Sequence, residues 1–289
     1  MIDKMILGTA QLGMNYGINN YGKINREDVF DILEYAYNNN IRTLDTAEIY
    51  GDALNLIGSF LREYPKKNFK IISKIDPNKK FQNNKMVKHL KSNLKILNIS
   101  CYHGYMLHSY KIFKEGPEIY QKLNKAKTEG YIEKIGISLY ENSEIIDIID
   151  NYNFDFIQVP FNLLDNENLK QDILKKAKNK LIDIHVRSIF LQGLFFKPNE
   201  DYNIQLKPLY RYIEKINKIA AANKTDIESL AIHYPLKKDY IDKIIFGVHD
   251  LNQFKKNIKI INSNIRVPET DIEGINVKEK ELLKPYNWI

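Results

Sequence analysis

Short apolar runs recur along this chain, and each is followed by a longer segment with the periodicity of a helix. MILGTA at 5–10 is one such run, and runs of this kind are typical of buried strands in parallel sheets. In REDVFDILEYAYNNN at 26–40, Val29, Leu33 and Ala36 instead fall on one helical face. The strand candidates are 5–10, 41–47, 69–75, 102–108, 132–138, 154–160, 181–188 and 243–248.

The alternation of the two kinds of segment predicts the topology. A second helical segment, 83–98, carries apolar residues on one face from Met86 to Leu97. Strands that alternate with helices pair in parallel through helical crossovers. Eight such units in 289 residues favour a closed barrel, because a doubly wound sheet commonly needs only about five or six strands. We therefore predict an α/β fold, a (β/α)8 TIM barrel that forms a single domain over residues 1–289.

The seventh interval, 189–242, is longer than the others. It begins with the irregular sequence FLQGLFFKPNEDYNIQL, and helical patterns follow near 208–223 and 226–238. Long excursions in compact domains are usually functional or carry extra elements. We therefore expect this interval to help form a binding site.

Composition and charge narrow the class of protein. The formal net charge is +7, and the surplus is scattered rather than gathered on the face or arm that nucleic-acid binding needs. Cys101 is the single cysteine, so neither an intrachain disulfide nor a cysteine-based metal cluster can form. No stretch reaches the roughly 18 apolar residues of a membrane span, and the N-terminus has no apolar run of secretory length. We expect a cytoplasmic protein without a metal site that binds neither nucleic acid nor membrane.

Four titratable side chains follow three consecutive predicted strands. Asp45 ends the second strand, with Tyr50 just beyond it, Lys74 ends the third and His108 ends the fourth. Chemistry in such barrels takes place at the C-terminal ends of the strands. Each residue alone has a structural explanation, since an aspartate can cap a helix, a lysine can be solvated, and a tyrosine or histidine can belong to the core. Their equal depth on neighbouring strands favours a shared site.

Together the four residue types fit carbonyl chemistry. A phenol with a pKa of about 10 donates a proton poorly near neutrality unless its phenolate is stabilised. Lys74 can stabilise the phenolate of Tyr50, and Asp45 can fix the position and charge of Lys74. His108 can orient a carbonyl oxygen or share the proton.

The chain resembles the aldo-keto reductase family in the order and spacing of its motifs. The resemblance implies a nicotinamide-dependent reductase of an aldehyde or ketone, with a sugar-type carbonyl as one candidate. Tyr50 would be the general acid, tuned by Lys74 and Asp45, and His108 would orient the substrate. The matching motifs are LGTAQLG (7–13), LDTAEIYG (44–51), ISK (72–74), LH (107–108), KIGIS (134–138), IQVPFNLLD (157–165), SIFLQGLF (188–195) and FGVHDLNQFKKN (246–257).

The same resemblance implies a set of cofactor-binding residues. Ser138 and Gln158 would hold the nicotinamide carboxamide. The last motif would bind the rest of the dinucleotide, with a helix start at 250–252 facing phosphate. The implied cofactor-binding residues are Gly8, Thr9, Ser138, Gln158, Arg187, Ser188, Gly247, Gln253 and Asn257.

Three positions depart from the family pattern. Leu139 replaces an asparagine that is frequent after the fifth strand, and Arg187 stands where many members stack a tyrosine on the nicotinamide. The guanidinium can stack there or bind an anionic substrate. Gln253 replaces a basic residue that many members use for the 2′-phosphate of NADPH. NADPH is the cofactor that the family implies, with NADH as the alternative.

The sequence is also compatible with two other functions. The departures at Leu139 and Arg187 are compatible with a barrel that binds the cofactor but has a regulatory role, and Lys74 is compatible with Schiff-base chemistry. We expect the substrate pocket to be formed by the loops after the fourth and seventh strands and by the tail at 281–289. Trp288 in that tail can equally seal the side of the barrel.

Overall fold

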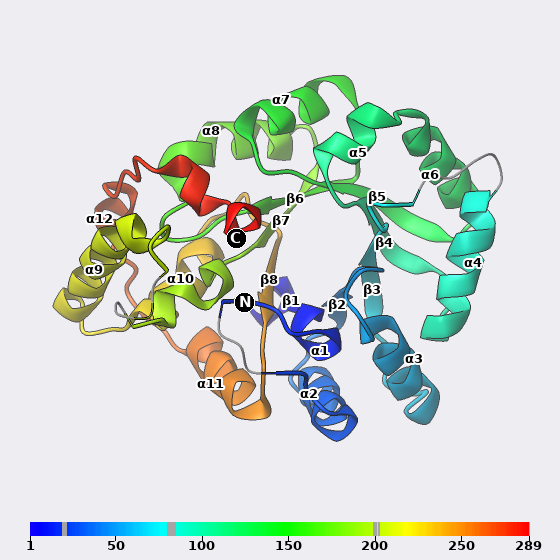
Figure 1. Ribbon diagram of the computed structural model, residues 1–289, viewed down its shortest axis with the longest axis horizontal. Coiled ribbons are helices and arrows are strands. Elements are labelled where there is room, and N and C mark those ends of the chain that lie inside the picture. The colour runs from blue at the N-terminus through cyan, green and yellow to red at the C-terminus, as the bar shows by residue number, and fades with distance from the viewer. Residues whose placement is uncertain (19–21, 80–84, 199–200, 202, 289) are drawn as a thin grey trace.

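A computed structural model of the protein describes residues 1–18, 22–79, 85–198, 201 and 203–288. The strands form one closed parallel barrel in sequence order, with β8 pairing with β1, and the helices surround it (Figure 1). This confirms the predicted TIM barrel. The strands are β1 (Met5–Gly8), β2 (Thr43–Asp45), β3 (Lys70–Lys74), β4 (Tyr102–Leu107), β5 (Ile132–Ser138), β6 (Phe156–Pro160), β7 (Asp183–Arg187) and β8 (Lys243–Gly247).

The helices also follow the predicted pattern. The two expected in the seventh interval are α9 and α10, and the first residues of the segment predicted at 83–98 lie outside the described residues. Among the described residues, no helix combines the length and apolar character that a membrane crossing requires. The α-helices are α1 (Ala10–Gly13), α2 (Arg26–Asn38), α3 (Ala53–Glu63), α4 (Lys85–Leu97), α5 (Tyr110–Glu115), α6 (Glu118–Thr128), α7 (Asn142–Asn151), α8 (Glu167–Asn179), α9 (Lys207–Ala222), α10 (Ile227–Leu236), α11 (Leu251–Asn262) and α12 (Glu269–Glu273).

Two apolar cores stabilise the barrel. The larger lies between the strands and the surrounding helices and contains the buried faces that the helical periodicity predicts. The smaller contains apolar residues from five strands. A Cβ at Gly136 would lie 2.3 Å from the ring of Phe156, so this glycine gives the ring its space. The residues of the smaller core are Ile6, Ile72, Met106, Phe156 and Ile245.

His185 on β7 is a buried titratable group beside this inner core. Its ring stacks on Phe156 with a centroid distance of 4.7 Å, and its Nδ1 has no hydrogen-bond partner among the described protein groups. Burial lowers the pKa of His185 from 6.5 to about 3. The imidazole is therefore neutral in the folded protein at neutral pH.

The buried neutral His185 makes the fold sensitive to acid. Below pH 6.5 the unfolded chain binds a proton at this residue that the folded chain does not bind, so stability rises with pH across this window and falls on acidification. At pH 5, the loss from this group is expected to be about 2 kcal/mol of unfolding free energy. Urea unfolding at pH 7 and pH 5 measures it, with His185→Phe as the non-titrating control. An equal loss in the variant and the natural protein would contradict the prediction.

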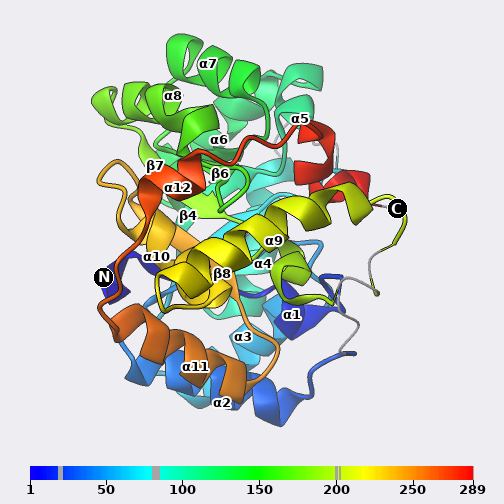
Figure 2. The same ribbon diagram turned by 90° about the vertical axis from the view of Figure 1, so that its left-hand side faces the viewer.

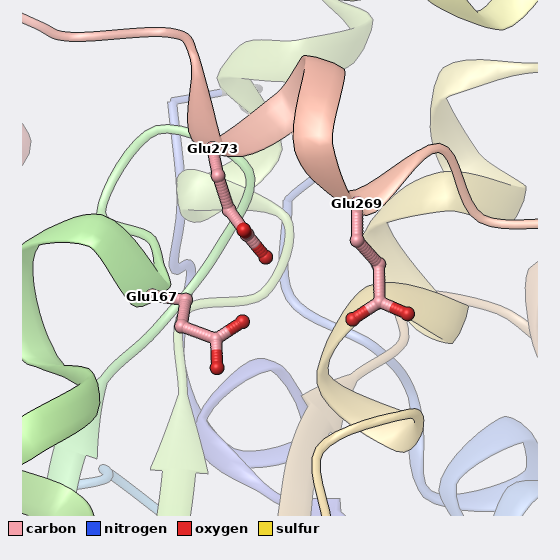
Figure 3. A group of neighbouring side chains, drawn as sticks. All are labelled: Glu167, Glu269 and Glu273. Carbon is pink, nitrogen blue, oxygen red and sulfur yellow. The ribbon is translucent and has the colours of Figure 1, made fainter.

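A buried lysine joins α12 to the start of α8. Figure 3 shows Glu167, Glu269 and Glu273 pointing toward one another from these two helices. The Lys238 ammonium pairs with all three carboxylates, at 2.9 Å from Glu273. The positive charge of Lys238 offsets the repulsion between the three carboxylates. The cluster therefore anchors the segment after β8 to the barrel.

The C-terminal tail lies on the same end of the molecule as the strand ends. The N-terminus and the tail segment drawn in red before the C-terminus lie at opposite ends of the barrel (Figure 2). Lys284 pairs with Glu141, just after β5, and Tyr286 packs edge-on against Tyr140 at 4.6 Å between ring centroids. Trp288 donates from Nε1 to the carbonyl of Leu282 at 2.9 Å. The tail thus packs beside the C-terminal ends of the strands.

Candidate active site

Two glycines shape the loop that carries Tyr50. Gly51 has φ +53°, in the left-handed region that glycine adopts without strain. A Cβ at Gly13 would lie 2.0 Å from the carbonyl oxygen of Tyr50, so the first and second strand-end loops touch backbone to backbone. The amide of Asp52 donates to the carbonyl of Gly13 at 3.1 Å. LGTAQLG and LDTAEIYG therefore form one rigid unit at the mouth of the barrel.

Asp45, Lys74 and Tyr50 come together as the sequence predicts. Asp45 and Lys74 form a buried ion pair, and the Lys74 ammonium donates to the hydroxyl of Tyr50 at 3.4 Å. The other carboxylate oxygen of Asp45 accepts from Nε2 of Gln158 at 2.8 Å. A chain of polar contacts thus runs from Gln158 on β6 through the ion pair to the phenol.

The phenol of Tyr50 holds its proton tightly. Burial raises the pKa of Tyr50 well above its ordinary value, and the charge of Asp45 raises it further, while Arg187 opposes both. The pKa lowering expected from Lys74 is therefore not seen in the free protein, because its charge is balanced by the paired carboxylate of Asp45. Tyr50 is a neutral phenol over the physiological pH range.

His108 lies beside Tyr50 and is also neutral. The two rings meet edge-on with centroids 6.3 Å apart. Burial, with a smaller contribution from the charges of Lys74 and Arg187, lowers the pKa of His108 to about 4. A neutral imidazole can form a hydrogen bond to a carbonyl oxygen but has no acidic proton to give at neutral pH. Of the two expected roles, this favours orientation over proton sharing.

A second polar network, not anticipated from the sequence, holds Glu48 in the loop between Asp45 and Tyr50. The carboxylate of Glu48 accepts from Nδ2 of Asn93 at 2.8 Å, lies 2.7 Å from Nε2 of His89 and bonds the hydroxyl of Tyr105. Burial opposes the charge, but these hydrogen bonds hold the pKa of Glu48 below its usual value. The amide of Glu48 donates to the carbonyl of Lys74 at 3.1 Å. The network thus ties the loop between Asp45 and Tyr50 to β3, β4 and α4.

A cavity of about 970 Å³, including its open mouth, adjoins Tyr50. Most of the predicted site residues line it, whereas Lys74, His108, Ser138 and Asn257 do not. Tyr16, which the sequence reasoning missed, lines it too and accepts a hydrogen bond from Nε2 of Gln192 at 3.1 Å. The predicted residues in the lining are Gly8, Thr9, Asp45, Tyr50, Gln158, Arg187, Ser188, Gly247 and Gln253.

The walls of this cavity differ in part from the expected ones. The loop after β7 contributes Phe190 and Phe196, as predicted. We expected the loop after β4 and the tail to line the pocket as well. Among the described lining residues, the loop after β1 contributes instead of these two segments. Tyr286 instead packs on Tyr140, which is not among the described residues that line the cavity, and Trp288 contacts the main core.

The helix start expected to face phosphate is already capped. The helix α11 begins at Leu251, and the carboxylate of Asp250 accepts from the amide of Gln253 at 2.8 Å. The side chain of Gln253 in turn accepts from the amide of His249 at 2.8 Å. A negative charge thus occupies the position that we had expected to favour phosphate.

Unpaired polar atoms and the cavity fit a nicotinamide cofactor. Oε1 of Gln158 is buried without a hydrogen-bond partner in the described protein, and Gln158 lines the cavity. Both polar atoms of the Asn257 side chain are buried without a partner as well. Buried amides usually have partners, so these atoms are candidates to bind a ligand.

Comparison with known proteins agrees with this geometry. The family model of the Aldo/keto reductase family matches residues 4–279. The NADH-specific methylglyoxal reductase of Escherichia coli (strain K12) is 22% identical in an alignment of 300 positions that covers 91% of this chain and 91% of that protein. The holo form of an aldo-keto reductase from Bacillus halodurans has a TM-score of 0.76 at 18% identity, over 96% of this chain and 94% of that one. Its apo form has a TM-score of 0.70 at 17% identity, over 93% and 94%.

The family match covers nearly the whole chain, and the solved structures share its barrel. This protein therefore belongs to the Aldo/keto reductase family and is an enzyme that reduces carbonyl compounds with a nicotinamide cofactor.

Proposed function

We propose that the protein reduces an aldehyde or ketone to an alcohol, with Tyr50 as the proton donor. The observation that carries the proposal is the hydrogen-bonded chain from Asp45 through Lys74 to the hydroxyl of Tyr50, which opens on the cavity. A bound nicotinamide supplies the hydride for the carbonyl carbon. All other steps fall to side chains of the chain itself.

The protonation states support a division of labour. Tyr50 keeps its proton until the carbonyl oxygen gains negative charge, because burial and Asp45 disfavour the phenolate in the free enzyme. As the proton leaves, the Lys74 ammonium at 3.4 Å donates to the forming phenolate. His108, neutral at physiological pH, orients the carbonyl oxygen.

The polar atoms near the cavity provide positions for the cofactor. Gln158 would bind the carboxamide through Oε1, with Ser138 beside it, since the two residues are register partners on β6 and β5. Gly247 and Gln253 line the same cavity. Asn257 on α11 would bind the remaining part of the dinucleotide through its two buried side-chain polar atoms.

Reduction of simple carbonyls tests the proposal directly. Purified protein with NADH or NADPH is expected to oxidise the cofactor in the presence of short aldehydes, ketones and open-chain sugars, as followed by nicotinamide absorbance. The sugar-type carbonyl is our narrower proposal within this class. Failure to bind either reduced cofactor at micromolar protein would refute the proposal, whichever carbonyl is used.

We further propose that NADH is preferred over the NADPH that family resemblance suggested. Asp250 places a carboxylate next to Gln253, and Arg187 is the sole lysine or arginine among the described residues of the cavity lining. A 2′-phosphate near Asp250 would be repelled.

The preference is expected to be roughly tenfold in Kd, measured by titrating nicotinamide fluorescence. Asp250→Asn keeps a helix cap but removes the charge, so it should narrow the ratio of the two dissociation constants. Tighter binding of NADPH by the natural protein would contradict the proposal. If the ratio of the two dissociation constants is the same in Asp250→Asn as in the natural protein, Asp250 is not the cause of the cofactor preference.

A further inference from the structure

The cavity contains a cation, Arg187, that pairs with no carboxylate among the residues that the structure describes. Among the described residues that line it, the fixed charges belong to Asp45 and Arg187. The carboxylate of Asp45 is neutralised by Lys74. Arg187 forms no ion pair in the described part of the chain. An arginine cannot lose its proton in a protein, so this half-buried guanidinium remains charged.

The contacts of Arg187 hold it in place without satisfying its charge. Its NH2 donates to the hydroxyl of Ser138 at 3.3 Å, and its NH1 donates to that of Ser188 at 3.4 Å. Its guanidinium lies over the ring of Tyr140, with the central carbon 4.1 Å from the ring centroid. Both hydrogen bonds are long and neutral, so a better acceptor can replace them.

We propose that Arg187 binds an anionic group of the substrate, so that the enzyme reduces aldehydes or ketones that carry a carboxylate or a phosphate. The inference rests on the carbonyl reduction proposed above for the same site. A guanidinium pairs with either anion through two parallel hydrogen bonds. Burying a lone charge is unfavourable unless it gains a partner, and the substrate would be that partner.

The position of Arg187 suits this role. It ends β7 and lines the same cavity as Tyr50. Its charge is felt at the reacting groups, because it lowers the pKa of both Tyr50 and His108. A substrate held by its anionic end at Arg187 would thus occupy the cavity that Tyr50 also lines.

The competing occupant of Arg187 is the nicotinamide ring. The ring of Tyr140 already contacts the guanidinium. The oxidised nicotinamide also carries a positive charge, which a neighbouring guanidinium would repel. Both considerations favour the substrate anion, and the experiment below separates the two.

Matched substrate pairs test the proposal by kinetics. Succinic semialdehyde is compared with butanal, and glyceraldehyde 3-phosphate with glyceraldehyde. In the natural enzyme, kcat/KM is expected to favour the anionic member of at least one pair by about tenfold or more. Arg187→Gln should bring that ratio close to unity and Arg187→Lys should restore part of it. Lys197→Gln, which removes a cation outside the described cavity lining, should keep the ratio.

Equilibrium binding gives a result that does not depend on turnover. Benzoate and benzamide are titrated calorimetrically into protein saturated with reduced cofactor. Tighter binding of benzoate, lost in Arg187→Gln, supports the anion site even if none of the carbonyls is reduced, which would count against the proposed reaction alone. Equal binding of the two probes overturns the inference. Weaker cofactor binding in Arg187→Gln with an unchanged substrate ratio also overturns it and assigns Arg187 to the cofactor.

Discussion

Replacement of Tyr50 by phenylalanine is expected to lower kcat by about 10³-fold, because it removes the hydroxyl that we propose as the proton donor to the carbonyl oxygen. The change deletes a single atom on a half-buried ring whose backbone is held by Gly13 and Gly51. The ring contact with His108 remains possible. The fold and the cofactor site should therefore survive.

The measurement compares steady-state turnover with cofactor affinity. The dissociation constant of the reduced cofactor should change by less than about threefold, so that the loss is confined to the chemical step. Glu48 provides a contrast: Glu48→Gln loosens the loop that carries Tyr50 and should lower activity while leaving the phenol present. Retention of normal kcat in Tyr50→Phe would show that another group protonates the product.

Replacement of Lys74 by methionine is expected to cost stability as well as activity. The change leaves the Asp45 carboxylate buried with Gln158 as a neutral partner. Breaking a buried ion pair from one side typically costs about 3–5 kcal/mol. Chemical denaturation should show this loss, and turnover should fall because the phenolate of Tyr50 loses its hydrogen-bond donor.

A double variant separates the two effects of Lys74. Combining Asp45→Asn with Lys74→Met removes both charges, so most of the stability should return. Activity should not return, because the donor to Tyr50 is still absent. If the double variant regains activity along with stability, then Lys74 has only a structural role and the proposed chemistry of this pair is wrong.

Much of the fold was predictable because its signals are local. Apolar runs and the apolar face of α2 can be recognised from residues that are close in sequence. The predicted strands match the observed ones to within a few residues. The observed β2 spans only Thr43–Asp45 within the predicted 41–47, because ladder pairing with β1 and β3 decides where a strand ends. Pairing partners lie far apart in sequence and leave no local signal.

The candidate site divides in the same way. By itself, the sequence determined that Asp45, Tyr50, Lys74 and His108 follow consecutive strands, because strand order and spacing bring strand ends to one rim. Only the tertiary structure decided their protonation, since burial sets the pKa of a phenol or imidazole and burial is not encoded in any short segment. It likewise placed Arg187 against Ser138, 49 residues away. The charge of Arg187 in the cavity results from this tertiary arrangement, and no sequence motif predicts it.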